Sequence, residues 1–82
     1  HIMATIDIIS PLPGTFYRKP DPDSPPFAEV GDTIAVGAVI GLVEVMKQYS
    51  ELTADEGGTI VSFEVADGDA VEAGQVVAVL EG

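Results

Sequence analysis

The sequence predicts a small all-β domain, and three observations lead to that prediction. Val and Ile outnumber Leu by 18 to 4, and β-branched side chains crowd a helix but suit a pleated strand. Glycines punctuate the 82-residue chain at intervals typical of short strands and turns. One segment of the chain also recurs further along. Many short strands joined by regular turns indicate a small sandwich or barrel.

We expect seven or eight short strands and no helix. The segment Val39–Val45 is apolar apart from Glu44, but it is short and follows Gly37, so we interpret it as a buried strand. The expected strands are Ala4–Ser10, Gly14–Tyr17, Thr33–Ile34, Val39–Val45, Gln48–Thr53, Gly58–Val65, Asp69–Val71 and Gln75–Leu80.

An internal repeat divides the chain into two halves. The segment Gly31–Glu44 matches Gly68–Glu81 at a constant offset of 37 residues, with five identical pairs among fourteen. The identical pairs include Gly31 with Gly68, Asp32 with Asp69, Gly37 with Gly74, and Glu44 with Glu81. Because Asp32 and Asp69 each follow a glycine, we expect both to form turns. Two similar halves predict a domain with pseudo-two-fold symmetry.

The first half carries an insert. A second match, Gly14–Phe16 with Gly58–Ile60, has an offset of 44, so seven extra residues lie between Gly14 and Gly31. That interval contains four of the six prolines, within Arg18–Pro26. Proline cannot pair within a central strand, so we expect the insert to form an extended or turn-rich projection.

Composition excludes several classes of partner. The formal net charge is −11, and the only bases are Arg18, Lys19 and Lys47. This charge argues against binding to nucleic acid and against binding to an anionic membrane surface. No apolar run is long enough to span a bilayer, and we recognise no signal peptide. The chain has no cysteine, so it has no disulfide or thiolate metal site. This composition fits a reducing cytoplasm, where we expect the protein to act.

The length predicts one domain, over residues 4–82. His1 and Ile2 resemble the remnant of an expression tag, and Met3 resembles a natural start. Groups suited to catalysis are scarce: Tyr17 and Tyr49 have no base in the sequence that could activate them, and the carboxylates are scattered. We therefore expect no catalytic residue and no metal site, and an independent hydrolase ranks last among the functions considered.

One lysine stands out. The residues Met46 and Lys47 join two apolar, strand-like runs, which places them at a tight hairpin turn, although the turn contains no glycine. An ordinary solvated lysine at a loop tip is one interpretation. However, the chain has only two lysines, and an exposed methionine lowers solubility without helping a core. Methionine is adaptable at recognition surfaces, so a partner enzyme reading this turn is the second interpretation.

The segment Glu44–Lys47 resembles the biotin attachment sequence of biotin carboxyl carrier proteins, where Ala or Val and then Met precede the modified lysine. The segments Ser10–Arg18, Glu51–Ala54 and Gly58–Ile60 are similar to the carrier domain of bacterial acetyl-CoA carboxylase, and the similarity covers Ile8 to Glu81. The resemblance implies a flattened β-barrel or sandwich of two antiparallel four-stranded sheets with quasi-two-fold symmetry. It also implies a thumb-like loop, here about Lys19–Phe27.

The same resemblance implies the function. Lys47 would carry covalent biotin, and a biotin protein ligase, which activates biotin as its adenylate, would recognise Val45, Met46 and Gln48. A biotin carboxylase would load a carboxyl group onto the biotin, and a carboxyltransferase would pass that group to an acyl-CoA. Acetyl-CoA, used in fatty acid biosynthesis, is the acceptor that the thumb favours, and propionyl-CoA or another acyl-CoA stays open as an alternative. The chain itself would be a non-catalytic carrier subunit.

Two positions depart from the family pattern. Gln48 stands where the family usually has Met. Lys19 stands where the thumb of the family often has a small hydroxyl residue that contacts biotin. Because Lys19 is not such a residue, no biotin-binding role carries over to it. Lipoyl domains, which are relatives, have Asp before their lysine, so Met46 favours biotin. Two alternatives stay open: a lipoyl carrier of a 2-oxoacid dehydrogenase, and an unmodified scaffold module.

Overall fold

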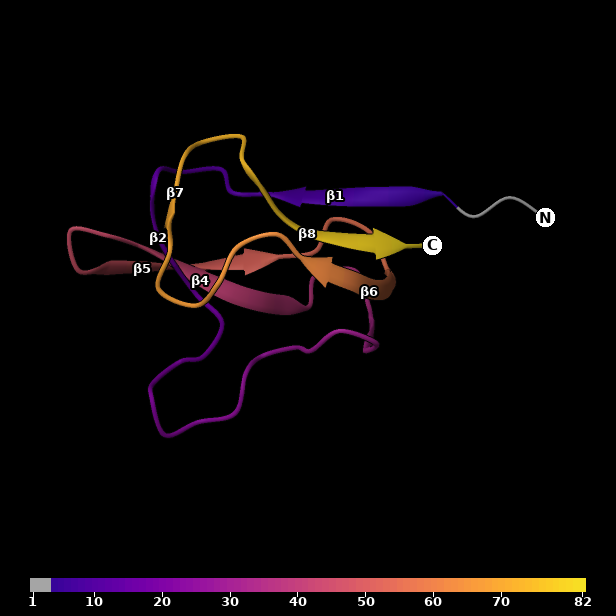
Figure 1. The fold of residues 1–82 in the computed structure, drawn as a ribbon, viewed down its shortest axis with the longest axis horizontal. Helices are drawn as coiled ribbons and strands as arrows, with labels where there is room; N and C mark the ends of the chain where they lie inside the picture. The colour runs from indigo at the N-terminus through magenta and orange to yellow at the C-terminus, as the bar shows by residue number, and fades with distance from the viewer. Residues whose placement is uncertain (1–3) are drawn as a thin grey trace.

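Two antiparallel sheets form the fold of residues 4–82, the part of the chain that this computed structural model describes (Figure 1). Each sheet has four strands, as expected. The molecule measures 19 Å in its thinnest direction, in keeping with two sheets packed about 10 Å apart. The strands are β1 (Thr5–Ile9), β2 (Gly14–Tyr17), β3 (Thr33–Ile34), β4 (Val39–Val45), β5 (Gln48–Thr53), β6 (Gly58–Phe63), β7 (Ala70–Val71) and β8 (Val76–Glu81).

The expected strands match those observed, with small differences at some ends. Four strands, β2, β3, β4 and β5, have the expected bounds, and β1 is shorter by one residue at each end. Strand β6 ends at Phe63 rather than Val65, and β8 runs from Val76 to Glu81. Strand β7 excludes Asp69 because that residue belongs to the preceding turn, where its Oδ2 accepts the Ala66 N–H at 2.9 Å.

The strand order shows the predicted two-fold relation. One sheet has the order β1-β8-β6-β3 and the other has the order β5-β4-β2-β7. Shifting every strand number by four converts one order into the other. Each sheet therefore takes two strands from each half of the chain, and the halves interlock.

The repeated glycines adopt matched backbone conformations. Gly31 and Gly68 have φ angles of 96° and 87°, and Gly37 and Gly74 have φ angles of 85° and 84°. These values lie in the left-handed region, which glycine enters without a Cβ penalty. The glycines thus recur in the sequence because the corresponding turns of the two halves need the same left-handed backbone conformation.

The repeated aspartates form turns, as predicted. Asp32 Oδ2 accepts the Glu29 N–H at 3.0 Å, just as Asp69 Oδ2 accepts that of Ala66. The backbone repeats as well, because the carbonyl of Asp32 accepts from Ile60 and that of Asp69 accepts from Phe16. Short polar side chains that bond to a nearby backbone N–H are typical of such turns.

The core lies between the sheets and draws on both halves. Phe16 and Ile60, which the sequence match paired, are both fully buried, and the Phe16 ring lies 6.5 Å from that of Phe63. The buried apolar residues are Ile8, Phe16, Ala28, Ile40, Val43, Leu52, Ala54, Ile60, Val71, Val77, Ala78 and Leu80.

The insert forms a projecting loop between β2 and β3, which we call the thumb and define as Lys19–Phe27 (the purple loop that hangs from the sheets in Figure 1). Its base is closed because Phe27 N donates to Arg18 O at 2.9 Å. Near its tip, the Asp21 carboxylate accepts from Asp23 N at 3.0 Å and from Ser24 Oγ at 2.8 Å. The thumb is therefore the turn-rich projection that the prolines predicted.

Within residues 4–82, no helix is long and apolar enough to cross a membrane. The predicted tag remnant and native start, at residues 1–3, lie outside the described residues, and the bounds of the expected domain stay a prediction.

Substituting Gly41→Ala should lower the free energy of unfolding by about 1–3 kcal/mol through overpacking. A Cβ at this position would clash with the buried Phe16 ring and lie 2.8 Å from Tyr17 O. Urea denaturation monitored by circular dichroism measures the change. Gly82→Ala is the matched control, because its Cβ would meet Ile6 Cδ1 at an ordinary 3.4 Å. Equal stability of the two variants would contradict this account of the core.

Deleting part of Asp21–Pro26 should leave the fold intact, because the thumb projects from the sheets and its base is closed at Arg18 and Phe27. The expected free energy of unfolding stays within about 0.5 kcal/mol of the parent value, as for other surface changes. Thermal and urea unfolding test this. Loss of cooperative unfolding would mean that the thumb is part of the core.

Candidate functional site

The hairpin of β4 and β5 closes through a two-residue turn, Met46 and Lys47, as predicted. Val45 pairs with Gln48 across the base of the turn. The φ angles of Met46 and Lys47 are 50° and 66°, so both lie in the left-handed region. This is the type I′ geometry, whose twist matches the flanking strands, but a side chain in that region costs roughly 1–2 kcal/mol per residue. The turn is therefore strained.

Glu44 holds the strained turn in place. Its Oε2 accepts the backbone N–H of Lys47 at 2.7 Å, a short bond of the kind that an ionised acceptor makes. The bond uses the backbone of Lys47 and leaves its exposed side chain outside the turn. Glu44 is the last residue of the first repeat, so the repeat ends where the turn begins.

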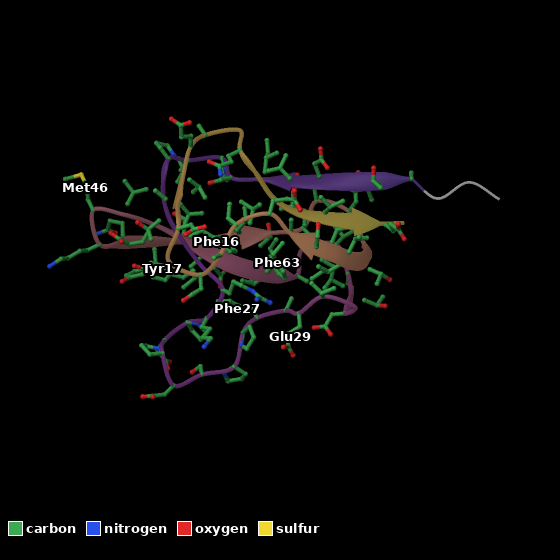
Figure 2. The ribbon with its side chains drawn as sticks, viewed as in Figure 1. Phe16, Tyr17, Phe27, Glu29, Met46 and Phe63 are labelled. Carbon is green, nitrogen blue, oxygen red and sulfur yellow. The ribbon has the colours of Figure 1, made fainter. Side chains whose placement is uncertain are left out.

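The side chains at the hairpin tip project into solvent. Met46 is 89% exposed, and Figure 2 shows it extending from the end of the hairpin, away from the core. Lys47 and Gln48 are also exposed, whereas Val45 is half-buried and packs against the core. A strained and exposed apolar residue contributes nothing to packing, so its place is better explained by a contact with another molecule.

A cleft of about 370 Å³ lies beside the hairpin, between the base of the thumb and β5. Two tyrosines meet on its wall, because the Tyr17 and Tyr49 rings are 6.3 Å apart. The sequence does not predict this cleft, because its walls come from segments far apart in the chain. Its lining residues are Tyr17, Lys19, Pro20, Asp21, Pro22, Tyr49 and Asp67.

Arg18 fixes the thumb against the sheets. Its guanidinium carbon lies 4.1 Å from the centroid of the Phe63 ring, a cation–π distance, and its Nη2 donates to Ala28 O at 3.0 Å. Its backbone N–H donates to Asp67 Oδ1 at 2.7 Å. Arg18 therefore joins the base of the thumb to β6 and to the loop after it. The sequence showed Arg18 as one of three bases but did not indicate this role.

The site offers an exposed primary amine and no metal centre. In the described part of the chain, no group of three or more His, Cys, Asp or Glu side chains is placed to hold a metal ion. A lysine amine on a turn tip is accessible for amide formation with a carboxylic acid.

Comparisons with known proteins point to carriers of one cofactor. A family model described as "Biotin-requiring enzyme", of the biotin/lipoyl type, matches residues 6–80. The chain is 40% identical over 72 residues to the biotin carboxyl carrier protein of acetyl-CoA carboxylase from Haemophilus influenzae, covering 88% of this chain and 46% of that protein. It is 47% identical over 62 residues to a chloroplastic protein of that name, form 1, from Arabidopsis thaliana, covering 76% of this chain and 22% of that protein.

A solved structure has the same fold. The chain superposes on part of the urea carboxylase of Kluyveromyces lactis with a TM-score of 0.78 and 28% identity, covering 94% of this chain and 6% of that one. The chain spans less than half the length of the carrier proteins that it matches.

Substituting Met46→Asn should raise the free energy of unfolding by about 0.5–1 kcal/mol, because Asn tolerates the left-handed region better than Met. Urea denaturation measures this. Ser50→Asn is the matched control: Ser50 is exposed within β5, where Asn is disfavoured, so that variant should lose stability. A loss of stability in both variants would contradict the strain assigned to the turn.

Proposed function

The chain belongs to the biotin/lipoyl attachment family of biotin-requiring enzymes, and from that premise we propose that it is a biotin carboxyl carrier in which Lys47 bears the biotin. The observation that supports this most directly is the exposed lysine at the tip of a strained two-residue turn, directly after an exposed methionine. The chain acts as a carrier and catalyses no step alone.

Lys47 fits covalent attachment of biotin. Its amine condenses with the carboxyl group of the biotin side chain, after a biotin protein ligase has activated that carboxyl as an adenylate. The amide carries no charge, so the net charge of the chain changes from −11 to −12. The bound cofactor supplies a ureido nitrogen that accepts a carboxyl group.

The residues beside Lys47 form the surface that the ligase reads. Met46 and Gln48 are exposed and flank the lysine, and the half-buried Val45 fixes the turn to the core. The type I′ backbone and the bond from Lys47 N to Glu44 present these side chains in one geometry. A preformed surface lowers the entropy lost when the ligase binds.

The fold gives the arm a rigid base. The hairpin tip lies at one end of the molecule, and the described ends of the chain meet at the other, where Gly82 N donates to Ala4 O at 3.1 Å (Figure 1). Both described ends of the chain therefore lie away from the hairpin tip. A tethered arm visits each partner site at an effective concentration on the order of millimolar for a short linker.

The partners proposed are a biotin carboxylase and a carboxyltransferase, with acetyl-CoA as the acceptor of the carboxyl group. The names of the relatives support this choice, since they are carrier proteins of acetyl-CoA carboxylase. We propose the cytoplasm as the compartment, and note that some relatives are named as chloroplastic.

Incubation with ATP, biotin and a biotin protein ligase tests the proposal, with intact mass and peptide mapping as the measurement. The expected result is one biotinyl group, on Lys47. Addition of lipoate by a lipoyl ligase, without addition of biotin, would replace the proposal with the lipoyl alternative. If neither ligase modifies the chain, the remaining interpretation is an unmodified scaffold module.

Substituting Lys47→Arg should abolish biotinylation while the free energy of unfolding stays within about 0.5 kcal/mol, because a side chain at a turn tip makes little packing contact. Peptide mapping measures the first effect and urea denaturation the second. Lys19, the only other lysine, serves as an internal control in the same molecule. Biotin still present on the Lys47→Arg protein would place the attachment elsewhere.

A further inference from the structure

Met46 is the most exposed of the large apolar side chains within residues 4–82. It is 89% exposed, and the next in order, Val36, is 70% exposed. Figure 2 shows its sulfur projecting past the tip of the hairpin, away from the other labelled residues. The sulfur therefore meets solvent directly, and a small solute can approach it freely.

This sulfur is the only one in the part of the chain that the structure describes. The sequence has no cysteine, and its other methionine, Met3, lies outside the described residues. Methionine is oxidised to its sulfoxide in a common oxidative lesion, and an exposed sulfur offers the oxidant a free approach. An oxidant of sulfur that meets residues 4–82 therefore reacts at the hairpin tip, directly beside Lys47.

The fold does not depend on the side chain of Met46, which is no part of the core. Backbone contacts hold the turn: Val45 pairs with Gln48, and Lys47 N donates to Glu44 Oε2 at 2.7 Å. A change confined to the sulfur leaves both contacts in place. Oxidation therefore alters the surface of the tip without altering the backbone that presents Lys47.

Recognition by a ligase, in contrast, depends on what this side chain presents. Met46 directly precedes Lys47, so a ligase that brings activated biotin to the amine covers the neighbouring side chain as well. The thioether is apolar and adaptable, whereas the sulfoxide is polar and chiral and disrupts contacts that methionine makes. Burying the sulfoxide oxygen in an apolar contact without a hydrogen-bond donor weakens the complex.

We propose that Met46 is a site of reversible oxidation by hydroperoxides, and that its sulfoxide form is a poor substrate for the attachment of biotin to Lys47. This inference rests on the proposed function, because it concerns the regulation of the same lysine. A chain that already bears biotin keeps it, since the oxidation breaks no bond of the amide. Met46 thus makes the supply of new biotinylated carrier depend on the level of hydroperoxide.

The oxidation transfers two electrons from sulfur to the peroxide. A lone pair of Met46 Sδ attacks the terminal oxygen of the hydroperoxide, and the S–O bond forms as the O–O bond breaks. The proton of the terminal oxygen passes to the departing oxygen, which leaves as an alcohol, or as water when the oxidant is hydrogen peroxide. Methionine sulfoxide reductases reverse the change. Their reductant is a dithiol, which becomes a disulfide while the sulfoxide oxygen leaves as water.

The test measures the initial rate of biotin attachment by a biotin protein ligase, with ATP and biotin, before and after the chain is treated with hydrogen peroxide. The peroxide is removed before the ligase is added, and peptide mapping verifies the oxygen atom on Met46. The parent is compared with Met46→Leu and Met3→Leu, each of which removes one of the two methionines. Each variant is compared with its own untreated sample, so any direct effect of the substitution cancels.

We expect the oxidised parent to take biotin about ten times more slowly than the untreated parent, at carrier concentrations below saturation. Met3→Leu should show the same loss of rate on treatment, and Met46→Leu should show none. The two methionine sulfoxide reductases, one for each epimer of the sulfoxide, should restore the rate of the parent. The midpoint of urea denaturation should be the same for the oxidised and the untreated parent.

An oxidised parent that takes biotin at the untreated rate would overturn the inference. A loss of rate in treated Met46→Leu would also overturn it, because the effect would then arise at another residue. A lower urea midpoint after oxidation would mean that the sulfoxide acts through the fold and not on recognition, and a rate that the reductases do not restore would exclude a reversible site. Failure of the untreated parent to take biotin would instead reject the proposed function.

Discussion

The fold depends on one constraint: neither half of the chain can complete a sheet alone. Strand β8, from the second half, lies between β1 and β6, and β4, from the first half, lies between β5 and β2. These two central strands contribute much of the core, including Ile40, Val43, Val77 and Leu80. The backbone bonds of the central strands are satisfied only when both halves are present, so the domain folds as a unit.

The functional features arise where the two halves differ. Strand β4 leads into the Met46–Lys47 turn, while its counterpart β8 runs to Glu81 near the described end of the chain. The thumb is present in the first half only. A symmetric frame thus supplies rigidity, and its departures from symmetry supply the lysine, the thumb and the cleft between them. Strain is placed at the turn because the surrounding ladder holds it there.

Charge and shape act together at this end of the molecule. The Arg18 guanidinium lies over the Phe63 ring and donates to Ala28 O, and Lys19 is the base that lines the cleft. Biotinylation would remove the charge of Lys47 itself. Arg18 and Lys19 would then be the only Lys and Arg charges left against fourteen carboxylates in the sequence.

The sequence by itself determined the strands, the two-fold relation and the place of Lys47. The β-branched residues, the repeated Gly-Asp pairs and the prolines are local signals, because each reflects the conformation of a few neighbouring residues. Only the tertiary structure decided that Tyr17 meets Tyr49, that Arg18 lies over Phe63, and that Asp67 lines the cleft. These contacts join residues far apart in the chain, 49 positions in the case of Arg18 and Asp67. They follow from the order in which strands pair, which depends on burying the whole core at once and not on any short segment.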